Sequence, residues 1–385
     1  MATAAPPQRL PRSLFVAALA LSALLATVWS VSGARLFLAC LIGVVAGLAL
    51  YHAAFGFTVH WRQFINEGRG AGLRSQFILI GLTSLVTFPL IGLADTLGIA
   101  ARGAVAPVGL SLIAGAFLFG FGMMFAGGCG SGTLFTVGGG STRMAVTLGA
   151  FVTGSLFATL HVGWWHGLPS LGRFGLIDRF GSLAAFGIVC TFMAAIWLYS
   201  AARERRLHGR LEAPRQTGTW LTGPWSLLAG AVALAAVGIA TLMLLGRPWG
   251  ITSAFALWGA KLAIAVGVDA ASWPYWQSRT GWLERSVFED PTSVMNFGII
   301  GGALLAANLA GRFRPTVRLT LAELGTALLG GLCMGYGARI GYGCNIGAYL
   351  GGTISGSLHG LAWMMAALAG SALALKLRTG RGFVP

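Results

Sequence analysis

Two cysteines lie in similar glycine-rich breaks of an apolar sequence: Cys129 in AGGCGSG (126–132) and Cys344 in GYGCNIG (341–347). Glycine permits the sharp turns at which helices end, and the first amides of a helix have no partner within it. Such amides, at the positive end of the helix dipole, bind anions without a full charge. A thiol beside them can form weak hydrogen bonds and contact the sulfur of a ligand.

The two breaks are related by an internal repeat. Displacing the chain along itself by 215 residues aligns GAFLFGFGMMFAGGCGSG (115–132) with GGLCMGYGARIGYGCNIG (330–347), and five glycines and the cysteine coincide. Interrupted apolar segments at corresponding positions of two halves indicate the binding site of a transporter. The predicted substrate-binding and relay residues at the breaks are Cys129, Cys344, Gly128, Gly130 and Gly343.

Two polar residues near Cys344 extend this candidate site. Asn345 either bonds a substrate oxygen or caps the short helix that follows. Arg339 lies five residues before Cys344 in an apolar segment, where a charge is costly and indicates function. We interpret it as a counter-charge for an anion; the alternative is an arginine that snorkels to the membrane interface.

Other candidate residues are interpreted as structural. Cys40, Cys190 and Cys333 lie inside continuous apolar segments, where cysteine packs as a small apolar residue. Lys261 and Asp269 are eight residues apart, which favours a structural ion pair over a proton-coupling site. The sequence has no Walker-type glycine loop, no CxxC and no metal-ligand spacing. We therefore predict no enzyme activity, no cofactor and no metal.

The composition is that of a membrane protein. The chain of 385 residues is 56% hydrophobic and 9% charged, with a mean hydropathy of +0.77, whereas soluble domains carry about 25% charged residues. Glycine is abundant, at 59 residues, and lets membrane helices approach closely. Eleven apolar segments approach the ~20 residues of a membrane span: 13–31, 34–57, 75–98, 107–128, 143–165, 181–200, 224–245, 252–271, 294–310, 320–338 and 356–376.

We expect an all-α polytopic membrane protein in which broken or re-entrant half-helices of two repeat halves meet at a central neck. The predicted parts are an extra N-terminal transmembrane helix (1–33), a first half (34–201), a basic cytoplasmic linker (202–220) and a second half (221–385).

The formal net charge of +16 comes mostly from arginines in loops. The sequence contains no soluble domain of useful size for a duplex, so nucleic acid is not a predicted partner. Lys and Arg mark the cytoplasmic side of a membrane, so the loop ARERRLHGRLEAPR (202–215) and both termini are predicted to face the cytoplasm. That orientation needs an even number of crossings, and the segment 248–260, which begins with proline, is the best candidate for an incomplete one.

Three stretches resemble the YeeE/YedE family of bacterial integral membrane proteins, a sulphur-transport family: GMMFAGGCGSGTL (122–134), RPWGITSAFALWGAKL (247–262) and GYGARIGYGCNIGAYLGGTISGSLHG (335–360). The resemblance covers nearly the whole chain beyond the first helix. It implies an hourglass-shaped helical protein of the inner membrane, in which thiosulfate passes into the cytoplasm along cysteine thiols. Cys129 and Cys344 match two of those cysteines.

One position departs from the family. In HWRQFINEGR (60–69), Ile65 stands where the family often has a further cysteine. The departure leaves another sulfur or selenium species open as substrate. A small cytoplasmic sulfur-carrier protein is a further candidate partner. The rival interpretation is a membrane thiol oxidoreductase that passes reducing equivalents through Cys129 and Cys344.

Overall fold

The helices of the structure follow the apolar segments of the sequence. The structure, a computed structural model, describes residues 12–214, 218–315 and 318–379. Eight helical stretches in these ranges are long and apolar enough to cross a membrane, and the one sheet has two short strands. The prediction of an all-α polytopic membrane protein is confirmed.

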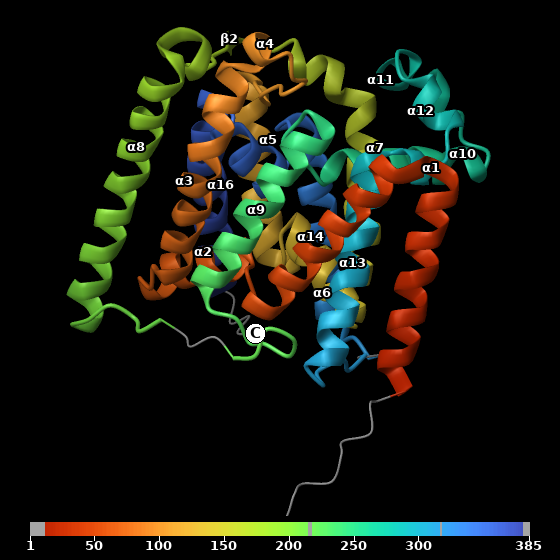
Figure 1. The fold of residues 1–385 in the computed structure, drawn as a ribbon, viewed down its shortest axis with the longest axis horizontal. Helices are drawn as coiled ribbons and strands as arrows, with labels where there is room; N and C mark the ends of the chain where they lie inside the picture. Colours follow the sequence, from red (N-terminus) through yellow and green to blue (C-terminus); the bar gives the residue numbers. More distant parts are fainter. Residues whose placement is uncertain (1–11, 215–217, 316–317, 380–385) are drawn as a thin grey trace, which may run out of the picture.

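The elements run as follows along the chain (Figure 1). The first part contains α1 (Arg12–Ala53), α2 (Phe57–Glu67), α3 (Ala71–Gly92), α4 (Ala94–Leu97), β1 (Pro107–Gly109), α5 (Leu110–Ala126), α6 (Gly130–Gly138), α7 (Thr142–His166), β2 (Ser170–Arg173) and α8 (Leu176–His208). The second contains α9 (Leu227–Leu245), α10 (Thr252–Ala265), η1 (Ala270–Ser272), α11 (Pro274–Gln277), α12 (Thr280–Glu284), η2 (Val287–Glu289), α13 (Pro291–Leu309), α14 (Leu321–Ile340), η3 (Asn345–Leu350), α15 (Gly351–Thr353) and α16 (Leu358–Thr379).

Four helices form the centre of the molecule, with the other long helices around them. Helix α14 packs against both α5 and α7, and α5 also packs against α16. Helices α5 and α14 cross where a Cβ on Gly122 would lie 2.7 Å from the carbonyl oxygen of Gly330. The repeated glycines therefore allow these two backbones to touch. Antiparallel strands β1 and β2, paired at Pro107 and Arg173, close one end.

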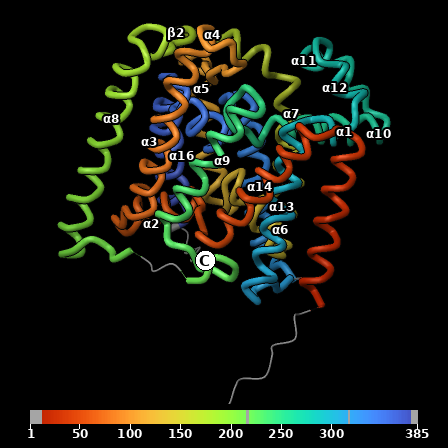
Figure 2. Tube along the Cα trace, in the orientation of Figure 1, coloured from red at the N-terminus to blue at the C-terminus, as the bar shows by residue number. Residues whose placement is uncertain are grey.

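Two long helices lie at the flanks of the molecule (Figure 2). Helix α1 contains the predicted span 13–31 and most of the predicted span 34–57, which ends four residues early at Ala53, and the two limbs join at Gly33, whose φ of +72° is easily adopted only by glycine. Helix α8 has a similar kink at Gly181, the residue at which the span 181–200 was predicted to begin. The N-terminal end of α1 and the C-terminal end of α8 lie at the same end of the molecule, here called the α8 end (Figure 1).

The predicted basic loop 202–215 is partly wrong. Helix α8 continues to His208, because Ala, Arg, Glu and Leu are good helix formers that extend a helix beyond its apolar part. Glu204 in this extension is fully buried and forms an ion pair of 2.7 Å with Arg74 of α3. Residues 215–217 of the predicted linker lie outside the described residues, as do Arg9 and Arg381 of the termini.

The helix observed at the predicted span 252–271 is shorter than that span. Helix α10 has 14 residues, about 21 Å at 1.5 Å per residue, against a hydrocarbon thickness of about 30 Å. Asp269 lies beyond its end and caps η1. Lys261 donates instead to the carbonyls of Leu283 and Arg285. The predicted ion pair between Lys261 and Asp269 is therefore wrong.

Candidate functional site

The first glycine-rich break is the start of a helix capped by a thiol. Helix α5 ends at Gly127, which has a φ of +84°, and Cys129 is the N-cap residue of α6. The backbone N–H of Gly132 donates to the Cys129 sulfur over 3.3 Å, and the hydroxyl oxygen of Ser131 lies 3.5 Å from it. The Cys129 thiol is therefore held at the positive end of α6.

The second break has similar backbone angles at its cysteine. Cys344 is the N-cap residue of η3, with φ −105° and ψ −168°, close to the values of −91° and −170° at Cys129. Gly343 before it has a φ of +146°, and a Cβ there would lie 2.8 Å from the backbone nitrogen of Ala348. Only glycine fits this turn. The Cys344 sulfur, unlike that of Cys129, accepts no capping hydrogen bond from the helix that it begins.

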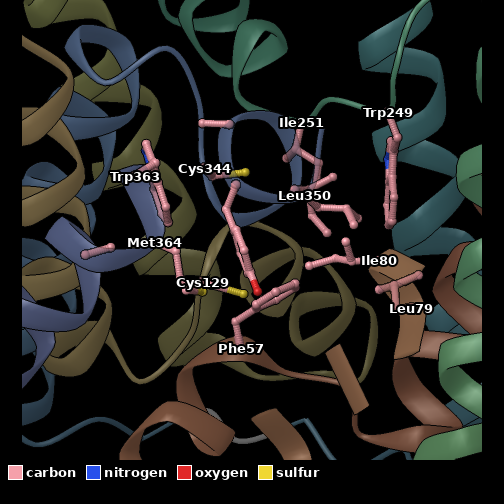
Figure 3. Packing of buried hydrophobic residues seen from close by; sticks show 14 of the residues in the cluster. Phe57, Leu79, Ile80, Cys129, Trp249, Ile251, Cys344, Leu350, Trp363 and Met364 are labelled. Carbon is pink, nitrogen blue, oxygen red and sulfur yellow. The ribbon is translucent and has the colours of Figure 1, made fainter. Parts of the chain in front are cut away.

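The two thiols come together at the centre of the molecule. A Cβ on Gly130, the first residue of α6, would lie 3.1 Å from the Cys344 sulfur. Both cysteines are free and buried, with exposed fractions of 1% for Cys129 and 0% for Cys344. Figure 3 shows both sulfur atoms in one apolar cluster. We call Cys129, Gly130 and Cys344 the thiol neck.

The two capped helices enter the neck from opposite directions. Ser111, near the start of α5, donates to the carbonyl of Ile340 at the end of α14 over 2.7 Å. Helix α5 therefore starts where α14 ends, so the two helices are antiparallel and their breaks approach from opposite ends. Gly128 lies on the α5 side, where a Cβ would be 3.1 Å from the Met144 sulfur. The structure thus brings together Cys129, Cys344, Gly128, Gly130 and Gly343.

Asn345 directly follows the thiol neck as the first residue of η3, but it does not cap this helix. Cys344, not Asn345, is the N-cap residue of η3. The Asn345 side chain is fully buried, and neither its amide nitrogen nor its oxygen has a partner among the described residues. The hydroxyl of Tyr349, also fully buried, has none either. Tyr349 was not selected from the sequence. The feature that could have identified it is a phenol four residues after Asn345 in an apolar segment.

Arg339 is not in contact with the thiol neck. Its guanidinium donates to the Tyr275 hydroxyl over 3.0 Å and lies 5.3 Å from the centre of that ring. Tyr275 belongs to α11, at the end of the molecule opposite the α8 end (Figure 1). There it lines a cavity of about 270 Å³ together with Arg247, Arg279 and Asp290. Arg339 therefore contacts a residue that lines this cavity, which we call the outer cavity.

The outer cavity is positively charged and lined by aromatic side chains. Arg247 donates to the Thr292 hydroxyl over 3.0 Å. Burial lowers the pKa of the Arg247 guanidinium below its usual value, and the neighbouring Asp290 carboxylate opposes part of this shift. Two arginines against one carboxylate leave the cavity net positive, which suits an anion.

A second basic group lies at the α8 end, next to the break that carries Cys129. Arg143 donates to the carbonyl of Phe125 over 2.9 Å, and its guanidinium would lie 3.4 Å from a Cβ on Gly127. Arg378 donates to the carbonyl of Met124 and is close enough to Arg143 for their charges to interact. The predicted span 143–165 begins at Arg143, and the structure places this residue in the first turn of α7; Arg378 was not selected from the sequence.

The position of the missing family cysteine lies on α2. This residue is Ile65, which has no thiol. Its side chain is half-buried and packs against the apolar core. The part of the chain that the structure describes also has no group of histidine, cysteine and acidic residues suited to a metal ion.

Comparison with known proteins agrees with this architecture. The sulphur transport family matches residues 52–373. The chain is 29% identical to the thiosulfate transporter TsuA of Spirochaeta thermophila over 271 residues, which is 62% of this chain and 69% of TsuA. It is 30% identical to the probable transporter YedE of Escherichia coli over 147 residues, 38% of this chain and 36% of YedE. The chain thus spans about a third of the length of YedE.

Proposed function

This chain belongs to the sulphur transport family, and on that premise we propose that it carries thiosulfate, or a closely related small sulfur compound, across the bacterial inner membrane into the cytoplasm. The name of TsuA supports thiosulfate as the substrate. The chain belongs to a family of sulfur transporters, and its thiols are buried. Both facts favour uptake of the sulfur compound over its chemical conversion.

One observation carries this proposal: two free thiols meet at the starts of two helices that enter from opposite ends. A sulfur anion that leaves water must exchange its hydration for other hydrogen-bond donors. The backbone amides at the starts of α6 and η3 are such donors. The thiols supply polarizable contacts for the terminal sulfur of the substrate. In this account substrate passes between the thiols by hydrogen bonds, and no covalent bond forms or breaks.

The charged groups at the two ends give the path a direction. We propose that the outer cavity, where Tyr275 holds Arg339, collects the anion from outside. Arg143 and Arg378 then lie on the cytoplasmic side, where basic residues collect. The same basic surface is where a small cytoplasmic sulfur-carrier protein would accept the product of transport.

Uptake by the purified protein tests this function. The protein is reconstituted into liposomes, and entry of sulfur-labelled thiosulfate is compared with liposomes that contain a Cys129→Ala/Cys344→Ala double variant. Saturable uptake by the natural protein alone supports the proposal. Absence of uptake by well-folded natural protein contradicts thiosulfate as the substrate, and the same assay with sulfite or selenium analogues then identifies the anion.

Mass analysis after turnover separates transport from the rival oxidoreductase. A transporter of this kind keeps Cys129 and Cys344 as free thiols throughout. A disulfide between them, formed in step with turnover, would favour the exchange of reducing equivalents.

A further inference from the structure

We propose that Asn345 and Tyr349 are substrate ligands that bind the oxygen atoms of the anion, while the two thiols contact its sulfur. This inference rests on the proposed function, because it assigns an orientation to the same substrate in the thiol neck. Thiosulfate has a terminal sulfur at one end and oxygen atoms at the other, so a neck with two chemically different sides can distinguish its ends.

The first argument is the lack of partners for two buried polar side chains. Asn345 and Tyr349 each have an exposed fraction of 0%. Their amide and hydroxyl groups make no hydrogen bond to any of the residues that the structure describes. Nearly all buried polar groups in proteins are paired, so each exception needs an explanation. An anion in the neck would accept hydrogen bonds from the Asn345 amide nitrogen and the Tyr349 hydroxyl.

The second argument is that both side chains belong to one helical face next to the thiol. Asn345 follows Cys344 directly, and the backbone N–H of Tyr349 donates to the Cys344 carbonyl over 3.3 Å. Residues four apart lie about one turn from each other on the same side of a helix. Asn345 and Tyr349 therefore lie about one turn apart on η3, the short helix that Cys344 begins.

The Tyr349 ring is held in place without the help of its hydroxyl. It packs edge-on against Phe57 with ring centres 6.1 Å apart, and it lies 6.2 Å from the ring of Trp61. Trp61 in turn donates to the Gln76 side chain over 3.0 Å. A ring fixed by apolar contacts presents its hydroxyl at a defined place, which lowers the entropic cost of binding a ligand.

The third argument is the chemical difference between the two halves. The displacement of 215 residues that aligns the cysteines places Asn345 on Gly130 and Tyr349 on Leu134. The first half therefore has no polar side chain at either position. Cys129 already has local partners in Gly132 and Ser131. Within residues 126–134 and 341–349, the buried side-chain donors without a partner are those of Asn345 and Tyr349, so we place the oxygen end of the anion on the η3 side.

The test is Tyr349→Phe, with Tyr199→Phe as the matched control. Tyr199 is 62% exposed on α8 and far from the neck in sequence. Loss of one hydrogen bond to a charged ligand should raise the thiosulfate concentration for half-maximal uptake roughly 10- to 150-fold. The melting temperature without thiosulfate should stay equal or rise, because Phe removes an unpaired polar atom from the interior. The control should change neither value.

Thermal protection by thiosulfate supplies a second readout. The ligand should raise the melting temperature of the natural protein more than that of Tyr349→Phe at the same concentration. Natural uptake and protection in Tyr349→Phe would overturn the inference, since the hydroxyl would then bond only to water. A lower melting temperature without ligand, at unchanged half-saturation, would also overturn it by showing a structural role. Failure of the natural protein to take up thiosulfate would instead refute the proposed function.

Discussion

Adding one methyl group to Gly130 should narrow the thiol neck while leaving both thiols in place. The Cβ of alanine would lie 3.1 Å from the Cys344 sulfur, 3.4 Å from the Cys344 Cβ and 3.8 Å from Ile251. The first distance is tighter than ordinary contact, so the Cys344 side chain must shift by a few tenths of an ångström. Stability should change little, because Gly→Ala in a helix gains about 0.4–1 kcal/mol through the unfolded state.

Transport should respond much more strongly than stability to Gly130→Ala. A substrate between the thiols would meet the new methyl group, and overpacking of a fitted site typically costs about 1–3 kcal/mol. That energy corresponds to a loss of roughly 5- to 150-fold in uptake. Gly149→Ala is the control, because a Cβ on Gly149 would meet nothing within 4 Å.

The assay measures initial uptake of labelled thiosulfate into liposomes at matched protein content, together with the melting temperature of each variant. Reduced uptake by Gly130→Ala at a natural melting temperature, with natural uptake by Gly149→Ala, supports passage through the neck. Natural uptake by Gly130→Ala would refute the reasoning, because the substrate would then bypass the space between the two sulfur atoms.

Further predictions concern the charged residues. Arg339→Leu should raise the half-saturating thiosulfate concentration up to about 5-fold, as for one half-exposed charge, and Arg339→Lys should retain part of the affinity; an unchanged concentration dependence in Arg339→Leu would remove this arginine from the path. Glu204→Ala should destabilise the protein by about 3–5 kcal/mol, because it leaves Arg74 buried and unpaired. Glu67→Ala, from an exposed pair, is its control in thermal unfolding, and equal losses would contradict this assignment. A reporter active only in the periplasm, fused after Arg210, should give no signal; strong activity would reverse the proposed orientation.

The helices and the two breaks were predictable because they depend on local sequence. Apolar length predicts a membrane helix whatever surrounds it, and the repeated glycines mark the places where α5 and α14 end. The capping residue of the second break was not predicted: Asn345 was the candidate from the sequence, whereas Cys344 is the N-cap residue of η3. The structure adds that Cys129 and Cys344 lie close to each other. From the sequence, this proximity was indicated only by the internal repeat that relates the two motifs.

The partners of single polar residues were not predictable, because they come from distant parts of the chain. Arg339 is bound by Tyr275, which lies 64 residues earlier. In the sequence, Tyr349 looks like an ordinary buried aromatic residue. Its contacts with Phe57 and Trp61 are seen only in the folded chain. Glu204, in the extension of α8, is paired with Arg74 of another helix, which lies 130 residues earlier.

Uptake by the single cysteine variants tests the central claim most directly. Cys129→Ala and Cys344→Ala should each abolish or severely reduce uptake of labelled thiosulfate into liposomes, at natural levels of folded protein. Cys190→Ala should transport as the natural protein does, because this cysteine lies inside α8, away from both breaks. Natural uptake by either Cys129→Ala or Cys344→Ala would contradict a path that runs between the two thiols.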